Sequence, residues 1–582
     1  MKEKSMTKPF RWFSLLGVSL ACVLALAGCT GYSASDASDD SALATYADIE
    51  SMDLEYTDRD KDASYDEATA TKITLEGESA RVEGDGAQAD GARVDIEAEG
   101  TYLIAGQLTN GQIHVNVADT EKVQLVLAGA SIHNETGAAL YVEQADKCFV
   151  TLALDTKNEL SDGADHSFVE GEDEPDATLF SKDDLTINGT GSLTVTGNYS
   201  DAIASKDELT ITGGTYVVTA AEDGLRGKDS LKILDGTFTI EAGEDCLKSS
   251  RDDDPARGFV SIDGGTFELN AGDDAIHGET YLRVTNGDIN VSSCNEGLEA
   301  MVVQVDDGII QVSSEDDALN AAAPSASTEQ SASGKGTEGM PGQEGMMPQR
   351  PTDQTESGTP PDLPRDDQAA AKAGGERPQP NANDALAQQN AEGTEQQRPN
   401  RDDAEPQPPA DGEQPQQQRQ QQGGEMQGQP QPGGMEEGNE SCQIIINGGT
   451  LTLEAKGDAI DSNGSLKING GTVFVTGPTS NGDGALDYAL EAECNGGTIL
   501  IVGSAGMAQD FSSSAQPSAF VNAKGAANQK AVVADQAGAE LFSYTPSAAF
   551  ETVIVSSPDL EDGQEYSLII GDTTTSFTAK TK

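Results

Sequence analysis

The chain has 582 residues, of which 35 are Lys or Arg and 100 are Asp or Glu, so its formal net charge is −65. This charge excludes nucleic acid as a partner, because duplex binding depends on neutralising phosphates with basic side chains. It also excludes simple electrostatic attachment to anionic lipid. A well-solvated chain, a set of divalent-cation sites, or both would account for so many carboxylates.

The first 29 residues have the pattern of a bacterial lipoprotein signal peptide. Basic residues between Lys2 and Arg11 precede an apolar run from Phe13 to Leu26. The run ends in Leu26-Ala27-Gly28-Cys29, which resembles a lipobox, the site of cleavage and of acylation on the cysteine. We therefore expect a protein anchored by lipid on Cys29 to the extracellular face of the cell membrane. An ordinary secretory signal with a chance cysteine is the alternative.

The next two segments differ in composition. Residues 30–71 are acidic and rich in Ser, Asp and Ala, which predicts a disordered tether. From residue 72 to about residue 161 the chain contains strand-like segments such as Tyr102-Leu-Ile-Ala-Gly. We interpret this part as the opening coils of a repeat array, with an N-terminal β cap that covers its edge.

A recurring phrase predicts the fold. Leu209-Thr-Ile-Thr-Gly-Gly-Thr is followed by a similar phrase at Leu231, a step of 22 residues. Alternating apolar residues indicate short strands with one face inward, and the glycines turn the chain. Strands this short bury a core only by stacking, so we expect an all-β fold, a right-handed parallel β-helix (solenoid) with coils about 4.8 Å apart. The same step joins Val260 to Leu282 and Ile444 to Leu466.

The predicted coils occupy residues 72–322 and 442–512. Between them, residues 323–441 are dominated by Pro, Gln, Gly and acidic residues, which predicts a long disordered insertion. A tolerated loop is one interpretation of the insertion, and a tether or wall-penetrating segment is the other. Residues 513–582 lose the repeat but keep strand-like segments, so we expect a β-rich C-terminal cap.

Each coil repeats an acidic turn, such as Asp245-Cys-Leu and Asp458-Ala-Ile. In stacked coils these carboxylates would form a row, and like charges so close are disfavoured unless protonated, hydrated or bridged by a cation. Rows of hard oxygen donors suit Ca²⁺, although acidic residues also make good solvated turns. The candidate calcium ligands are Asp223, Asp245, Asp273, Asp274, Glu296, Asp316, Asp317, Asp458 and Asp461.

A second stripe lies three residues after each acid and should face solvent. A row of donors and cations at regular spacing suits a linear polymer that carries carboxylates. Ion pairs between these bases and the acids of neighbouring coils are the alternative. The only tryptophan is Trp12, so we expect sugar binding to be mainly polar and ionic. The candidate substrate-binding residues are Arg226, Lys248, His277, Glu299 and Asn320.

Five cysteines follow Cys29 and indicate no disulfide framework, because they are scattered and odd in number. Cys148 and Cys494 fall where neighbouring strands carry buried aliphatic residues. We therefore expect buried free thiols.

Several motifs together resemble one family. Leu179-Phe-Ser-Lys-Asp-Asp-Leu-Thr-Ile-Asn-Gly, Asp223-Gly-Leu-Arg-Gly-Lys-Asp and Asp458-Ala-Ile-Asp-Ser-Asn-Gly are similar to the bacterial carbohydrate-binding domain family. That family is typified by a clostridial surface protein that binds cellulose and polygalacturonic acid. The resemblance covers residues 73–512 apart from the insertion. It implies a right-handed parallel β-helix with bound calcium, similar in fold to pectate lyases but without known catalytic activity.

We therefore expect a monomeric surface lipoprotein that binds polysaccharide, of an acidic, polygalacturonate-like kind, non-catalytically and with calcium. One alternative is a β-helix polysaccharide lyase, in which calcium would acidify the sugar C5 proton and Arg226 or Lys248 would be the base. No single coil stands out as a catalytic centre. The other alternative is a structural adhesin or spacer.

Overall fold

The computed structural model describes residues 43–168, 174–324 and 438–582, which belong to one compact unit. Cys29 and nearly all of the predicted insertion lie outside the described residues. The described chain is all-β, with two large sheets whose strands are mostly parallel and one small antiparallel sheet. Within those three ranges no helix has the length and apolarity to cross a membrane.

A 13-stranded sheet runs along one side, and all its pairs are parallel except β3–β4. Most of its strands have only three to five residues. The strands are β3 (Ala87–Asp90), β4 (Arg93–Ile96), β6 (Gln112–Asn116), β8 (Leu140–Gln144), β11 (Ala177–Ser181), β14 (Asp201–Ser205), β17 (Leu225–Gly227), β20 (Leu247–Ser249), β23 (Ile276–Gly278), β26 (Leu298–Ala300), β29 (Leu319–Ala321), β32 (Ile460–Ser462) and β35 (Asp487–Tyr488).

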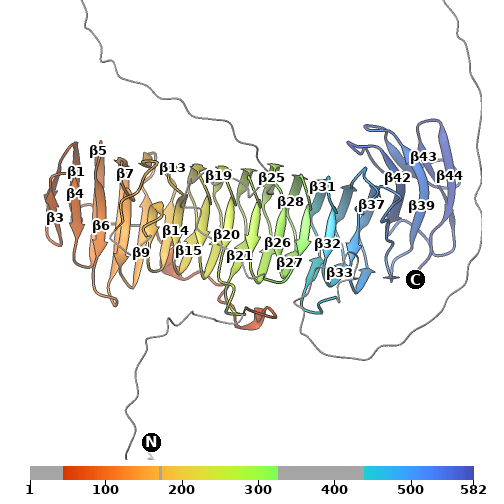
Figure 1. The fold of residues 1–582 in the computed structure, drawn as a ribbon, viewed down its shortest axis with the longest axis horizontal. Helices are drawn as coiled ribbons and strands as arrows, with labels where there is room; N and C mark the ends of the chain where they lie inside the picture. Colours follow the sequence, from red (N-terminus) through yellow and green to blue (C-terminus); the bar gives the residue numbers. More distant parts are fainter. Residues whose placement is uncertain (1–42, 169–173, 325–437) are drawn as a thin grey trace, which may run out of the picture. The chain divides into compact units, whose positions relative to one another are not determined.

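A 27-stranded sheet contains two more runs of parallel strands, which diverge after the long strand β7 (Lys122–Asn134). Successive strands of each run lie side by side (Figure 1). The first run is β9 (Lys147–Leu152), β12 (Leu185–Gly189), β15 (Glu208–Ile211), β18 (Ser230–Ile233), β21 (Phe259–Ile262), β24 (Tyr281–Val284), β27 (Val302–Val305), β30 (Gln443–Ile446), β33 (Ser465–Ile468), β36 (Glu491–Cys494) and β38 (Ser513–Ser514). The second is β10 (Lys157–Asp162), β13 (Ser192–Gly197), β16 (Thr215–Ala220), β19 (Thr237–Ala242), β22 (Thr266–Asn270), β25 (Asp288–Ser293), β28 (Ile309–Ser314), β31 (Thr450–Ala455), β34 (Thr472–Thr476) and β37 (Thr498–Gly503).

The register of these strands confirms the 22-residue step. Leu209 pairs with Leu231 in the next repeat, and Val260 pairs with Leu282 in the same way. Stacking also continues across the insertion, because β27 pairs with β30 and β29 with β32. Equivalent side chains therefore lie on one another, as in the interior ring stack of Tyr216, Phe238 and Phe267, whose centroids are 4.8 and 4.7 Å apart.

Glycine makes the turn between the two runs possible. The second glycine of the Gly-Gly pair has a φ of +114° at Gly214 and +107° at Gly265, a conformation that other residues rarely adopt. A Cβ atom on Gly265 would also lie only 3.0 Å from the carbonyl oxygen of Gly236 in the preceding repeat. The second glycine of the phrase is thus required both by backbone conformation and by the close approach of stacked turns.

Antiparallel strands cover both ends of the parallel runs. At the N-terminal end, β2 (Ala80–Glu83) pairs with β1 (Thr71–Gly77), which itself pairs with β5 (Gly100–Leu108). At the other end, β42 (Phe550–Ser556) pairs with both β37 and β39 (Ser518–Gly525). A separate four-stranded sheet follows, formed by β40 (Ala531–Ala534), β41 (Glu540–Tyr544), β43 (Glu565–Ile570) and β44 (Thr573–Thr578).

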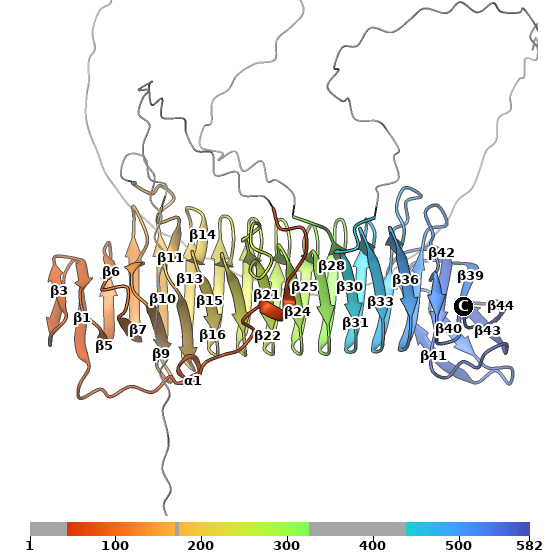
Figure 2. The same cartoon turned by 90° about the horizontal axis from the view of Figure 1, so that it is seen from below.

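Residues 44–62, which we name the strap, lie against the parallel strands (Figure 2). The strap contains η1 (Ile49–Ser51) and α1 (Asp58–Lys61), and a capping box of Thr57 and Asp60 starts α1. The Ala44 N–H donates to the Asp252 carbonyl oxygen at 2.6 Å, and Asp60 is only 1% exposed. This differs from the disordered tether predicted for residues 30–71, because polar groups of the strap find buried partners on distant strands.

The five cysteines of the described residues are all free and buried, which confirms the expectation of buried thiols. Burial raises the pKa of Cys148 and of Cys246 to about 12. These thiols therefore remain protonated at neutral pH and act as small apolar side chains.

Candidate functional site

The predicted stripe exists as one continuous row on the 13-stranded sheet, but the expectation that it faces solvent is wrong for Asn320, which is buried. Strand pairing places Arg226 beside Lys248, Lys248 beside His277, and so on through successive strands. The row spans the insertion, because Asn320 on β29 pairs with Asp461 on β32. From Ala204 onward the register partners are Ala204, Arg226, Lys248, His277, Glu299, Asn320, Asp461 and Asp487.

The predicted acidic row also exists, and its carboxylates accept hydrogen bonds from backbone N–H groups. The N–H of Asp245 donates to Asp223 Oδ1 at 3.1 Å, and the N–H of Asp274 donates to Asp245 Oδ1 at 2.8 Å. The same contact joins the Asp458 N–H to Asp317 Oδ1 at 2.8 Å across the insertion. One carboxylate oxygen of these acids thus satisfies a turn N–H of the next repeat, and the other oxygen remains for a cation.

Bases of the stripe supply that cation in the first half of the row. Arg226 donates to Asp201 Oδ2 at 2.6 Å and to Asp176 Oδ2 at 3.0 Å. Lys248 Nζ lies 3.0 Å from Asp245 and 3.3 Å from Asp223. Although burial lowers the pKa of Lys248, these two carboxylates raise it well above the usual value. The geometry here is that of ion pairs between stripe and acidic row.

His277 marks the end of the paired half. Its Nδ1 lies 2.7 Å from Asp274 and 3.3 Å from Glu299, and its Nε2 lies 3.6 Å from Glu279. Burial lowers the pKa of His277, but the hydrogen bonds to these carboxylates outweigh burial and raise it well above the usual value. His277 is therefore a cation at neutral pH.

Beyond His277 the row is acidic. In the part of the chain that the structure describes, no Lys, Arg or His pairs with Asp317, Asp458 or Asp487. Burial raises the pKa of Asp317 to about 8, and repulsion from Asp461 adds to this effect. Burial likewise raises the pKa of Asp458 to about 6, although the Gly484 N–H donates to it. These acids are kept together without a basic side chain to neutralise them.

Asn320 has an unsatisfied oxygen beside these acids. The residue is 8% exposed, and its Nδ2 donates to Glu296 Oε2 at 2.7 Å and to Glu299 Oε1 at 3.4 Å. Its Oδ1 is buried without a hydrogen-bond partner among the described residues. Since nearly all buried polar atoms in proteins have a partner, this oxygen indicates a missing donor or cation.

Among the residues that the structure describes, three groups of side chains are close enough to hold a metal, with ligand atoms within 4.8 Å of one another. Carboxylates with an amide oxygen beside them are the donor set that Ca²⁺ prefers, so the second half of the row fits calcium. Asp273 and Asp316, two of the predicted ligands, are exposed and lie outside the buried row. The groups are Asp245, Asp274 and His277; Asp274, Glu296 and Glu299; and Asp458, Asp461 and Asp487.

Sequence reasoning missed two parts of this row. Asp487 was detectable, because Gly484-Ala-Leu-Asp487 has the spacing of Asp458-Ala-Ile-Asp461. Aromatic side chains also extend the row beyond Ala204, and the expectation of a purely polar stripe did not foresee them. These side chains are Phe180, Tyr141 and His114, which follow Ala204 one after another in the strand register.

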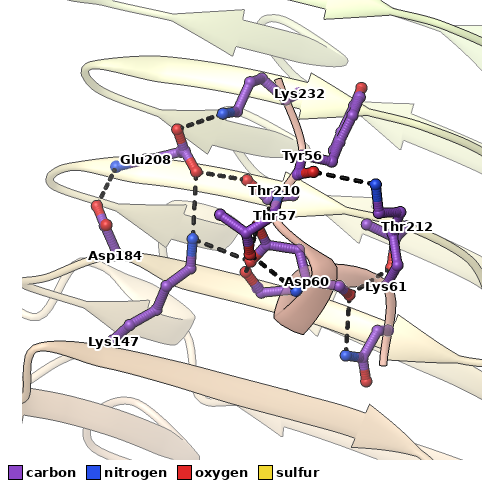
Figure 3. Close-up of polar contacts among 12 residues, drawn as sticks. Tyr56, Thr57, Asp60, Lys61, Lys147, Asp184, Glu208, Thr210, Thr212 and Lys232 are labelled. Atoms are coloured by element: carbon purple, nitrogen blue, oxygen red, sulfur yellow. Dashed lines mark hydrogen bonds and ion pairs between the residues drawn. The ribbon is translucent and has the colours of Figure 1, made fainter. Parts of the chain in front are cut away.

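A second buried charge cluster, which we name the strap cluster, fixes the strap to the 27-stranded sheet (Figure 3). Lys147 Nζ lies 3.1 Å from Asp60 and 3.3 Å from Glu208, and Lys232 Nζ lies 2.7 Å from Glu208. Lys232 also donates to the carbonyl oxygens of Asp53 and Glu55, at 3.2 and 3.0 Å. The Glu208 N–H donates to Asp184 Oδ1 at 3.3 Å, so two ammonium groups serve three carboxylates, and each ammonium group has a carboxylate partner from the chain.

The fold and the site thus define an all-β protein of parallel sheets with a charged row along one of them. The model of the family "carbohydrate-binding domain-containing protein" matches residues 90–332. A carbohydrate-binding domain-containing protein of Acetivibrio thermocellus is 42% identical over 209 residues, which are 36% of this chain and 73% of the relative. The chain belongs to this family of carbohydrate-binding domain-containing proteins.

One solved structure is also similar. It is described as that of the polysaccharide lyase-like protein from C. thermocellum, gadolinium derivative. The two sequences are 34% identical, the match covers 38% of this chain and 91% of that one, and the TM-score is 0.38.

Proposed function

We propose that this chain is a surface lipoprotein that binds acidic polysaccharide through calcium, without catalysis. In this proposal the stacked parallel strands form a right-handed β-helix, and lipid on Cys29 holds it on the extracellular face of the cell membrane. The family supports a carbohydrate ligand. The distribution of charge along the row supports the acidic class of ligand and the need for a cation.

The unsatisfied Oδ1 of Asn320 is the observation that carries the calcium proposal. Calcium between Asn320 and the acids of the next repeats would neutralise the carboxylates whose pKa burial has raised, such as Asp317. A calcium ion takes six to eight oxygen ligands, more than one group of side chains here provides. The remaining positions would accept carboxylate and hydroxyl oxygens of a sugar.

The paired half of the row supports binding without catalysis. A lyase of this kind needs an uncommitted base beside the metal, yet Arg226 is held by Asp201 and Asp176, and Lys248 by Asp223 and Asp245. Incubation with polygalacturonate and calcium, followed by absorbance of unsaturated product, tests this point. Product that disappears in an Arg226→Ala or Lys248→Ala variant would establish a lyase instead.

Retention on immobilised polygalacturonate, with calcium and with chelator, tests the binding function. We expect calcium to strengthen retention of the wild-type protein. Asn320→Ala should weaken calcium binding, measured by calorimetry, by about tenfold or more. Asp572→Asn, an exposed acid in the turn before β44, is the matched control and should behave as wild type. A protein retained by neither acidic nor neutral polysaccharide would favour a spacer or adhesin.

Anchoring is tested separately. A Cys29→Ser variant should appear in the culture medium or behave as an unprocessed precursor, whereas the wild-type protein should partition into detergent. Equal partitioning of the two proteins would exclude lipid on this cysteine.

A further inference from the structure

A row of lysines lies beside the aromatic end of the stripe. Lys182, Lys206 and Lys228 each follow directly after the last residue of a strand, β11, β14 and β17 respectively. The backbone N–H of each lysine donates to the preceding repeat, so the three side chains start from equivalent positions on successive repeats. The acceptors are the carbonyl oxygens of Val142, Ser181 and Ser205, each at 2.9 Å.

Carboxylates of the described chain neutralise this row only in part. Lys206 pairs with Glu174, whereas Lys182 and Lys228 form no ion pair with any residue in the described ranges. Burial lowers the pKa of Lys228, and the positive charges of Lys206 and Arg251 lower it further. Arg226, by contrast, contacts three carboxylates. The lysine row therefore has capacity for an external anion that the stripe bases do not have.

Two of the three aspartates next to the lysines have other partners, whereas Asp207, beside Lys206, forms no ion pair among the described residues. Asp183 accepts a hydrogen bond from the Ala145 N–H at 2.8 Å. Asp229 pairs with Arg251 at 2.6 Å and also with Arg257. These two acids thus serve a turn and a neighbouring loop, and they leave the ammonium groups of the row to other partners.

Tyr141 adds an aromatic surface at one end of the row. Its ring is half-buried, with the Phe180 centroid 6.0 Å from its own and Lys182 Nζ also 6.0 Å from its centroid. The ring lies between those of Phe180 and His114, whose centroids are 6.0 and 5.3 Å away, so it offers its exposed edge beside a cation to a sugar bearing a carboxylate.

We propose that Lys182, Lys206, Lys228 and Tyr141 form a second glycan contact, which binds carboxylates of an acidic polysaccharide directly and without calcium. The backbone positions of adjacent lysines are separated by about 4.8 Å, the distance between strands, and their long side chains can reach carboxylates of a uronate chain that lies along the stacking direction. The net charge of −65 does not prevent this contact, because physiological salt screens charges beyond about 8 Å. The proposal rests on the proposed function for its ligand class.

The test measures binding of the full-length protein to polygalacturonate by affinity electrophoresis, in chelator and over a range of salt. We expect the wild-type protein to retain binding in chelator, and this binding to weaken as salt rises. The triple variant Lys182→Gln/Lys206→Gln/Lys228→Gln should lose that residual binding by about tenfold or more, a change of about 1.4 kcal/mol. With calcium present, both proteins should still bind.

A second triple variant controls for net charge. Lys456→Gln/Lys524→Gln/Lys530→Gln removes the same three charges from exposed pairs elsewhere, and it should bind as wild type. Equal loss of binding in both triple variants would overturn the proposal that the lysine row binds glycan. Complete loss of wild-type binding in chelator would overturn it as well. Tyr141→Ala should weaken binding in chelator and Tyr141→Phe should not; equal effects would remove the ring from the proposal. If the wild-type protein binds under neither condition, the proposed function fails as well.

Discussion

Two charge clusters in this protein, one buried and one half-buried, differ in how far their charges are balanced. The strap cluster places Lys147 and Lys232 against Asp60 and Glu208, so each buried charge has an opposite partner from the chain. The second half of the acidic row collects Asp317, Asp458 and Asp487, none of which pairs with a basic side chain of the described residues, and leaves the oxygen of Asn320 unsatisfied.

This difference separates a structural cluster from a candidate ligand site. A buried charge is costly unless it is paired and hydrogen-bonded, so an array of carboxylates without cations persists only if protons or an external cation compensate. The strap cluster has no such requirement, and its role is to hold residues 44–62 on the sheet. The predictions below test the comparison.

The largest effect should come from unbalancing the strap cluster. In a Lys147→Met variant, Asp60 and Glu208 lose the cation that joins them, and breaking a buried pair costs about 3–5 kcal/mol. Denaturant unfolding measures this loss. Lys456→Met is the control, since its pair with Glu315 is exposed and contributes about 0–1 kcal/mol. Equal losses in the two variants would contradict a structural role for the cluster.

Calcium should stabilise the protein only through the second half of the acidic row. At a concentration a hundredfold above its Kd, calcium should stabilise the wild-type protein by about 2.7 kcal/mol relative to chelator. Lys147→Met should show the same increment, and Asn320→Ala a smaller one, in calorimetric melts. A melting temperature that chelator leaves unchanged would mean that the acidic row is only a series of turns.

Deletion of residues 325–437 should leave the calcium increment intact. The acidic half is assembled across this segment by pairing of β29 with β32 and by the contact of Asp317 with the Asp458 N–H. Shortening a loop gains about 0.6 kcal/mol for each halving of its length, so stability should rise by no more than about 2 kcal/mol. Loss of the calcium effect in the deletion variant would show that the insertion contributes to the site.

The most diagnostic difference between the two regions is an opposite response to pH. Burial raises the pKa of Asp60, but hydrogen bonds from Thr57 and the charge of Lys147 lower it below its usual value of 3.8. The contribution of Asp60 to folding stability is therefore present above pH 3.8 and is lost as pH falls through the lowered pKa. The pKa of Asp317 is raised to about 8. Its contribution to folding stability is therefore fully present below pH 3.8 and is lost as pH rises toward 8.

Melting curves in chelator distinguish these two responses. Between about pH 4 and about pH 8 the wild-type protein should lose stability as pH rises, and Asp317→Asn should flatten this dependence. Calcium should flatten it as well, because a bound cation replaces the protons. An unchanged slope in Asp317→Asn would assign the effect to other carboxyls.

The sequence by itself determined the register. Side chains alternate along a strand and the phrase returns with Gly-Gly turns, so Leu209 pairs with Leu231 as the 22-residue step predicts. For the same reason the stripe from Arg226 to Asp461 could be predicted, even across the insertion. A repeated local pattern encodes the contact between neighbouring repeats.

Only the tertiary structure decided which charges are compensated. Asp176, which pairs with Arg226, does not belong to the repeated sequence pattern. The partners of Asp60 lie on strands far along the chain. The orphaned oxygen of Asn320 and the ring of Tyr141 beside the lysine row are likewise products of packing. Composition could not distinguish the strap from a tether, because the same polar residues are solvated in one case and buried with partners in the other.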